Sequence, residues 1–132
     1  MVRELQVRLI DVGGLPVLDV VDDKDENKFD RKAEAWLIRW ELDASLAGFS
    51  FNDLCSAAPG FTLITNPVVG VIRNPKILPN GRILTVHNHH AGEDSRDTWT
   101  YMLRVGNGTL EYATTHGRGR IITYNNPNII NR

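Results

Sequence analysis

Two histidines separated by one residue are the clearest candidates for chemistry in this sequence. They are His87 and His89, and Glu93 follows four residues after the second. In a β-strand alternate side chains point to the same face, so both imidazoles could bind one metal ion, with the carboxylate as a third ligand. The alternative interpretation is that they are exposed histidines at the end of a strand, on the face opposite its apolar residues.

The spacing around these histidines resembles the first sequence motif of the cupin family. That motif is Gly, five residues, His-x-His, three or four residues and Glu, and the sequence has Gly81, His87, His89 and Glu93 at this spacing, over about 13 residues. The resemblance implies a metal-dependent enzyme on a barrel fold, in which these two histidines, Glu93 and His116 bind one Fe, Mn or Zn ion. The closing Gly of the motif and the second cupin motif around His116 are absent.

A second group of candidate ligands lies in the acidic segment 19–34, which carries seven acidic and four basic residues. Asp23, Asp25, Asn27 and Glu34 occupy positions 1, 3, 5 and 12 of a loop with the ligand spacing of an EF-hand calcium site. Lys28 stands at position 6, where such a loop requires Gly, and the flanking segments alternate as strands rather than helices. A solvated loop is therefore the main interpretation, with a weak calcium site as the alternative.

Arginine and glycine alternate near the C-terminus, where Arg118 and Arg120 follow one glycine each. A guanidinium binds phosphate or carboxylate with two parallel hydrogen bonds, and glycine lets the backbone approach closely, so the two arginines are a candidate anion site. A turn followed by an edge strand is the alternative. No aromatic residues alternate with these arginines, and the formal net charge of the chain is −1, so the sequence argues against nucleic acid as a partner.

Several other kinds of site and segment are not indicated by the sequence. Cys55 is the only cysteine, so no disulfide can form within the chain, and we interpret it as a small buried apolar residue rather than a nucleophile. Charged residues interrupt the apolar positions near the N-terminus, and no run approaches the ~20 apolar residues that span a bilayer. We therefore expect a cytoplasmic protein that does not bind membranes and has no catalytic constellation.

Apolar and polar residues alternate with a period of two along most of the chain. The clearest example is the segment 35–42, where Trp36, Ile38 and Trp40 fall on one face. Asn-Gly and Gly-Asn-Gly sequences separate pairs of such segments, as in β-hairpins. The pattern predicts one all-β domain over residues 1–132, an antiparallel β-sandwich of immunoglobulin-like type, with a jelly roll or cupin-like barrel as the alternative.

The aromatic residues on these strands are expected to form the core, although they could alternatively line a ligand groove. The residues expected to point inward are Trp36, Ile38, Trp40, Leu84, Val86, Trp99, Tyr101, Leu103, Val105, Leu110 and Tyr112.

The order of features from Trp36 to the C-terminus resembles small bacterial β-sandwich proteins of unknown role. A strand with Trp leads to the Phe-rich turn 48–51, then to paired hairpins with a Tyr-x-Leu-x-Val strand at 101–105 and a Pro-x-Ile ending at 127–129. The resemblance implies the immunoglobulin-like topology and no specific activity. We expect a non-catalytic binding or assembly module without a cofactor, which binds a protein partner or a second copy of itself through exposed strand edges or loops. The alternative function is the metal-dependent cupin-like enzyme, with one transition-metal ion.

Overall fold

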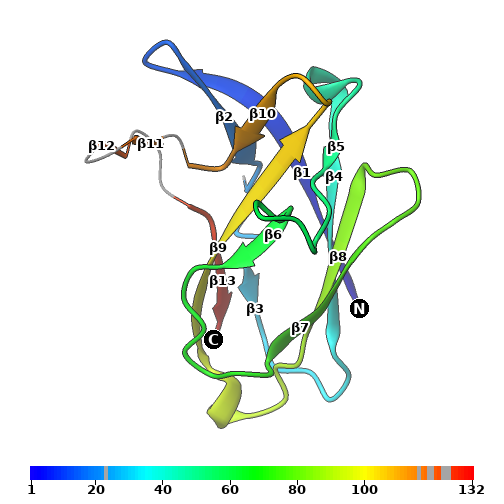
Figure 1. Ribbon diagram of the computed structural model, residues 1–132. Helices are drawn as coiled ribbons and strands as arrows, with labels where there is room; N and C mark the ends of the chain where they lie inside the picture. Colours follow the sequence, from blue (N-terminus) through cyan, green and yellow to red (C-terminus); the bar gives the residue numbers. More distant parts are fainter. Residues whose placement is uncertain (23, 116, 119–120, 123–125) are drawn as a thin grey trace.

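The computed structural model describes residues 1–22, 24–115, 117–118, 121–122 and 126–132, and its regular secondary structure is β-strand apart from two short 3-10 turns. Figure 1 shows two sheets that face each other, with the five-stranded sheet on one side and strand β9 at the centre of the other. The first sheet contains, in spatial order, β2 (Leu15–Val20), β1 (Val2–Val12), β4 (Trp36–Leu42), β8 (Ile83–Asn88) and β7 (Ile72–Ile77). The prediction of an all-β sandwich is confirmed.

The second sheet is built around β9 (Asp97–Gly106), the longest strand on that side. Its other members are β10 (Glu111–Ala113), β13 (Asn128–Asn131), β3 (Lys28–Phe29), β5 (Ser50–Phe51) and β6 (Phe61–Leu63). The short strands β11 (Gly117–Arg118) and β12 (Ile121–Ile122) form a separate hairpin, and two 3-10 turns, η1 (Ala44–Leu46) and η2 (Glu93–Ser95), connect strands.

Most strand pairs are antiparallel, but β1 pairs with β4 and β13 pairs with β3 in parallel. The period-two pattern cannot reveal this, because it shows which face a side chain occupies and not which strand lies alongside. The immunoglobulin-like topology stays a prediction.

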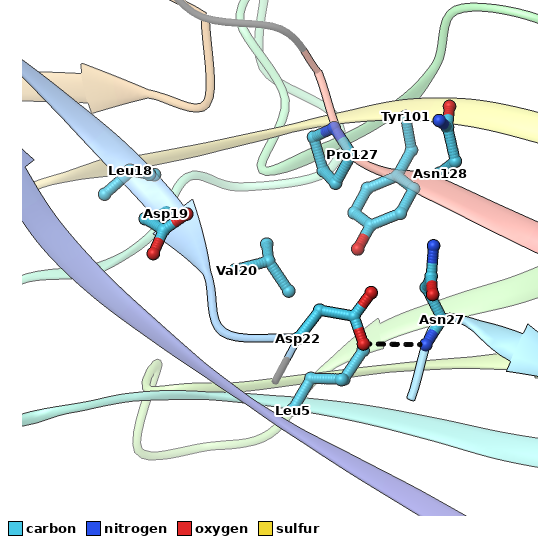
Figure 2. A pocket seen from close by; sticks show the side chains of 9 residues that line it. All are labelled: Leu5, Leu18, Asp19, Val20, Asp22, Asn27, Tyr101, Pro127 and Asn128. Carbon is cyan, nitrogen blue, oxygen red and sulfur yellow. Dashed lines mark hydrogen bonds between the residues drawn. The ribbon is translucent and has the colours of Figure 1, made fainter. Parts of the chain in front are cut away.

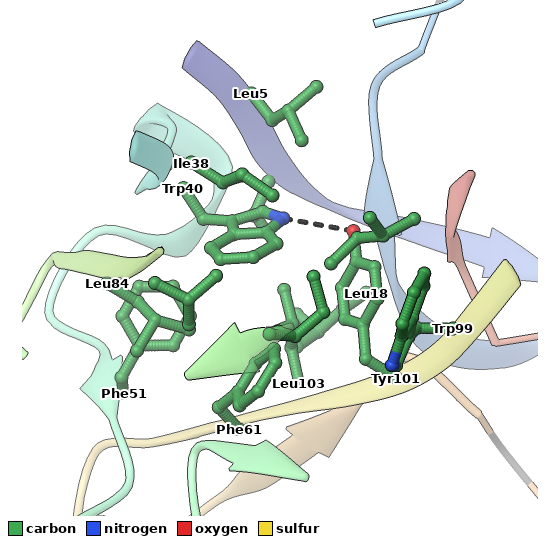
Figure 3. Packing of buried hydrophobic residues seen from close by; sticks show 14 of the residues in the cluster. Leu5, Leu18, Ile38, Trp40, Phe51, Phe61, Leu84, Trp99, Tyr101 and Leu103 are labelled. Atoms are coloured by element: carbon green, nitrogen blue, oxygen red, sulfur yellow. Dashed lines mark hydrogen bonds between the residues drawn. The ribbon is translucent and has the colours of Figure 1, made fainter. Parts of the chain in front are cut away.

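The core consists of the alternating aromatic and aliphatic residues of the two facing sheets (Figure 3). Trp40 and Trp99 are fully buried, and Tyr101 packs edge-on against Trp40 with a ring-centroid distance of 5.2 Å. The inward positions predicted from alternation are therefore buried as expected, except that Tyr112 is half-buried against the core and Leu110 is exposed. Leu110 is 50% exposed, because it lies in the turn before β10, where the Asn107 side chain accepts a hydrogen bond from its backbone N–H.

Arg3 of β1 makes contacts between the two sheets. Its Nη1 donates to the carbonyl oxygens of Glu26 and Lys28, at 2.7 and 3.0 Å. The guanidinium also lies 4.8 Å from the ring centroids of both Phe29 and Trp36. The side chain thus joins the first sheet to strand β3 and to the loop before it.

Strand β7 forms one edge of the first sheet and is irregular. The register with β8 shifts between Arg73 and Lys76, so Asn74 and Pro75 form a bulge. Asn74 has a φ of +58°, and proline has no N–H to donate to another strand. A bulge with proline on an edge strand hinders the addition of a further strand.

A buried polar network joins the two sheets near the end of the chain. The side-chain amides of Asn88 and Asn131 donate to each other's oxygen, at 2.7 and 2.9 Å. The Asn131 amide also donates to the Ser95 carbonyl, at 3.1 Å. His90, fully buried, bonds through Nε2 to the Arg132 carbonyl and through Nδ1 to the Ser95 hydroxyl. Because a carbonyl only accepts, Nε2 carries a proton.

In the part of the chain that the structure describes, no helix is long and apolar enough to cross a membrane.

Candidate functional site

The two histidines of the His-x-His sequence lie on the outer face of the first sheet. His87 is paired with Leu37 of β4 and with Arg73 of β7, and His89 follows directly after the end of β8. Their ring centroids are 6.0 Å apart, with the rings nearly perpendicular. The prediction that both occupy one face, opposite the core, is confirmed.

The neighbours of these imidazoles do not favour a metal ion. Arg73 Nη2 lies 3.1 Å from His89 Nδ1, and arginine only donates, so the lone pair of Nδ1 accepts this bond. Neutral His89 then carries its proton on Nε2, and neither nitrogen is free as a ligand. The Asn74 amide nitrogen lies 3.3 Å from His87 Nδ1 in a similar arrangement.

Glu93 is directed toward arginines rather than toward a metal site. It lies in η2 and forms ion pairs with Arg31 and Arg96, the latter at 3.3 Å. Among the residues that the structure describes, no three His, Cys, Asp or Glu side chains gather as they must to bind a metal ion. The predicted grouping of His87, His89 and Glu93 is thus not assembled, because the turn after β8 places the carboxylate beside cations. His116 lies outside the described residues.

The candidate calcium ligands are likewise not brought together within the described ranges. Asp25 forms an exposed ion pair with Lys28 at 3.2 Å, and Glu34 is exposed near the start of β4. Asp23 is outside the described residues. Strand β3 occupies positions 6 and 7 of the expected loop, and the segment is followed by strand β4 rather than by the helix of an EF-hand.

The remaining sequence candidates give no site in the described structure. Arg118 lies in β11, Arg120 is outside the described residues, and the anion site stays a prediction. Cys55 is exposed, which corrects the expectation of a buried side chain. It lies in a turn where its backbone N–H donates to Asp53, at 2.7 Å.

Sequence reasoning missed a cavity of about 210 Å³. It lies where β2 and the loop before β3 approach β9 and the start of β13 (Figure 2). Four of the residues that line it are apolar, namely Leu5, Leu18, Val20 and Pro127. The other five are polar, namely Asp19, Asp22, Asn27, Tyr101 and Asn128. No short motif predicts such a cavity, because its residues come from five separate segments.

Tyr101 supplies the innermost polar group of the cavity. Its side chain is 1% exposed, and Trp40 Nε1 donates to its oxygen at 3.0 Å. The indole nitrogen can only donate, so the phenolic proton is left for another acceptor. Figure 2 shows the hydroxyl directed toward Asp22. Burial raises the pKa of Tyr101 far above its usual value, so the phenol stays protonated and acts as a donor.

Asp22 lies at the exposed mouth of the cavity, and one of its oxygens accepts a hydrogen bond from the Asn27 backbone N–H at 3.3 Å. Partial burial, followed by the neighbouring Glu26 carboxyl, raises the pKa of Asp22. The nearby Asp19 is nearly buried and forms an ion pair with Arg8 at 2.8 Å. Asp22 is therefore the acidic group of the cavity that faces Tyr101.

His89 is expected to make the protein less stable in mild acid. Burial, then the charge of Arg73, then His87, lower the pKa of His89 in the folded state below the unfolded value near 6.5. The unfolded chain binds the proton more readily, so this contribution is complete above about pH 6.5 and is lost as the pH falls toward the folded-state pKa. Urea unfolding at pH 7.5 and 5.0 should show a smaller loss for His89→Gln than for the wild type, and equal losses would contradict this.

No model of a known protein family matches the chain, and a search of curated proteins found no relative.

Proposed function

We propose that the protein is a non-catalytic binding module and that the cavity between its sheets is the binding site. One observation carries this proposal, namely that the buried Tyr101 hydroxyl accepts from Trp40 and lies on the side of the ring toward Asp22, so its proton is available to a group in the cavity. Polar groups that converge in a cavity also lined by apolar side chains are typical of ligand sites.

The arrangement of donors and acceptors defines the ligand group. Tyr101 offers a proton, whereas an ionised Asp22 carboxylate only accepts. A group placed between them must accept from the phenol and donate to the carboxylate, as a hydroxyl or a carboxamide does. Leu5, Leu18 and Val20 provide apolar contacts for the carbon atoms beside that group.

The size of the cavity limits what can enter. Its volume of about 210 Å³ is below the roughly 300–1,000 Å³ of drug-sized sites. The ligand is therefore a small hydroxyl or carboxamide compound, or a side chain such as Gln or Ser presented by a partner protein. Strand addition is hindered at two of the sheet edges, since β7 has a bulge with Pro75 and the Arg3 guanidinium binds the Lys28 carbonyl of β3.

NMR titration with small probes tests this proposal. We expect acetamide, at millimolar concentrations, to shift the backbone amide signals of Val20, Asn27 and Asn128 with saturation. Methylammonium and acetate should bind at least fivefold more weakly, because the first cannot accept from Tyr101 and the second cannot donate to Asp22. A glutamine-containing peptide distinguishes a partner side chain from a free small molecule.

The variant Tyr101→Phe should weaken acetamide binding at least fivefold, because it removes the phenolic donor and leaves the ring in place. Tyr112→Phe is the matched control, since Tyr112 packs against Phe49 at a ring-centroid distance of 5.3 Å and does not line the cavity. The amide spectrum of each variant reports whether the fold is retained. Equal binding by the Tyr101 variant and the wild type, or the absence of saturable shifts with every probe, would refute the proposal.

A further inference from the structure

The outer face of the first sheet carries a row of polar residues across three strands. Arg39 of β4 is paired with Thr85 of β8, and Thr85 is paired with Lys76 of β7. Paired residues on adjacent strands point to the same face, and adjacent strands are about 4.8 Å apart. The two cations therefore flank a hydroxyl on the face opposite the core.

A second row lies two residues along β8 and, because of the bulge at Asn74 and Pro75, three residues along β7, where His87 is paired with Arg73. Both Arg73 and Lys76 are exposed. We call the surface formed by Arg39, Arg73, Lys76, Thr85 and His87 the basic face. It lies on the side of the first sheet away from β9, in the region of β4, β8 and β7 in Figure 1.

The part of the basic face on β7 and β8 carries cations and no carboxylate of its own. No Asp or Glu occurs between Asp53 and Glu93, so the β7 and β8 strands carry no carboxylate. On the neighbouring strands, Glu4 of β1 is paired with Arg39 in the register and Glu41 of β4 lies two residues from it, so the excess of positive charge is on the β7 side. Within the described residues Arg39 forms no ion pair, and its Nε is a buried atom with no hydrogen-bond partner.

We propose that the basic face binds an acidic segment of a partner protein in an extended conformation. Alternate residues of an extended chain lie on one side about 6.6–6.8 Å apart, which is also the separation of Thr85 and His87 along β8. Carboxylates at positions i and i+2 can therefore contact the Arg39–Lys76 row and the Arg73 row at once. The Thr85 hydroxyl can donate to the first of these carboxylates.

Protein is favoured over nucleic acid by the side chains of this face. Its two rows contain no Phe, Tyr or Trp on which bases could stack, and their residues from β4 to β7 are Arg39, Thr85, Lys76, Leu37, His87 and Arg73. The proposal is independent of the cavity, which lies between the sheets and is lined by other residues.

Fluorescence anisotropy with a labelled peptide of alternating Glu and Thr residues tests the proposal. We expect the peptide to bind, and binding to weaken with rising salt concentration. The same peptide with Gln in place of Glu should bind at least tenfold more weakly. Lys76→Glu, a change at an exposed position, should weaken binding of the acidic peptide about tenfold, and Arg39→Gln should weaken it severalfold.

Lys24→Glu is the matched control, because it reverses an exposed charge in the loop before β3, and it should bind as the wild type does. The amide spectrum of each variant checks that the fold is retained. Equal binding of the Glu and Gln peptides, or no effect of Lys76→Glu in a folded variant, would overturn the proposal. Tighter binding of a single-stranded DNA of the same charge than of the acidic peptide would overturn the choice of a protein partner.

Discussion

Replacing Arg82 by Met is expected to lower the free energy of unfolding by about 3 kcal/mol. The guanidinium donates through Nη1 to the carbonyls of Leu46 and Phe49, at 2.9 and 3.0 Å. Through Nη2 it donates to the carbonyls of Leu42 and Asp43, both at 3.0 Å. Methionine keeps most of the aliphatic stem but leaves all four acceptors without this partner, so the segment between β4 and β5 loses its main cross-link.

Urea denaturation followed by circular dichroism measures this loss. Arg82→Lys should fall between the wild type and the methionine variant, because an ammonium has the charge but not the planar fork that reaches four carbonyls. Arg96→Met is the control, since Arg96 forms only an exposed ion pair with Glu93, and it should change stability by less than about 0.5 kcal/mol. A loss of that small size for Arg82→Met would show that the segment does not depend on the guanidinium.

The second large effect is expected at the Asn88–Asn131 pair, which joins β8 of one sheet to β13 of the other. The exposed fractions of these residues are 0% and 2%, and their amides bond to each other twice. Asn88→Ala or Asn131→Ala should each destabilise the protein by about 2–3 kcal/mol, because each leaves a buried amide without its partner.

The double variant should lose less than the sum of the two single losses, with a coupling of about 1–2 kcal/mol, since the second substitution removes a group that is already unpaired. The measurement is a double-mutant cycle by urea denaturation. Asn88→Ala combined with Asn52→Ala is the control cycle, because Asn52 donates to Ala58 in another part of the fold, and its losses should add. Additive losses for Asn88 and Asn131 would mean that the paired amides do not act together.

Arg82 and Asn131 each support a part of the fold that carries a proposed binding site. Arg82 follows the turn between β7 and β8, the two strands that supply Arg73, Lys76 and Thr85 to the basic face. Asn131 anchors β13, whose first residue, Asn128, lines the cavity. Binding measurements therefore need variants whose fold has been verified. Tyr101→Phe removes only the hydroxyl, and Lys76→Glu changes an exposed side chain.

The candidate metal site shows which contacts cannot be predicted from neighbouring residues in the sequence. The His-x-His pattern correctly placed His87 and His89 on one face. It could not show that Arg73, 16 residues before His89, donates to that histidine, or that Glu93 pairs with Arg31, 62 residues before it. Both contacts join segments that are distant in sequence, and both act against a shared metal ion.

Alternation of apolar and polar residues by itself determined the all-β class and the inward positions of Trp40, Trp99 and Tyr101, because the side-chain period of a strand is a local property. Tertiary structure decided which strands are neighbours, including the parallel pairs, and so which side chains meet. The cavity, the basic face and the Asn88–Asn131 pair all arise from that choice. Their residues come from separate strands, and pairing between strands depends on burial and hydrogen bonding over the whole fold, which no short stretch of sequence contains.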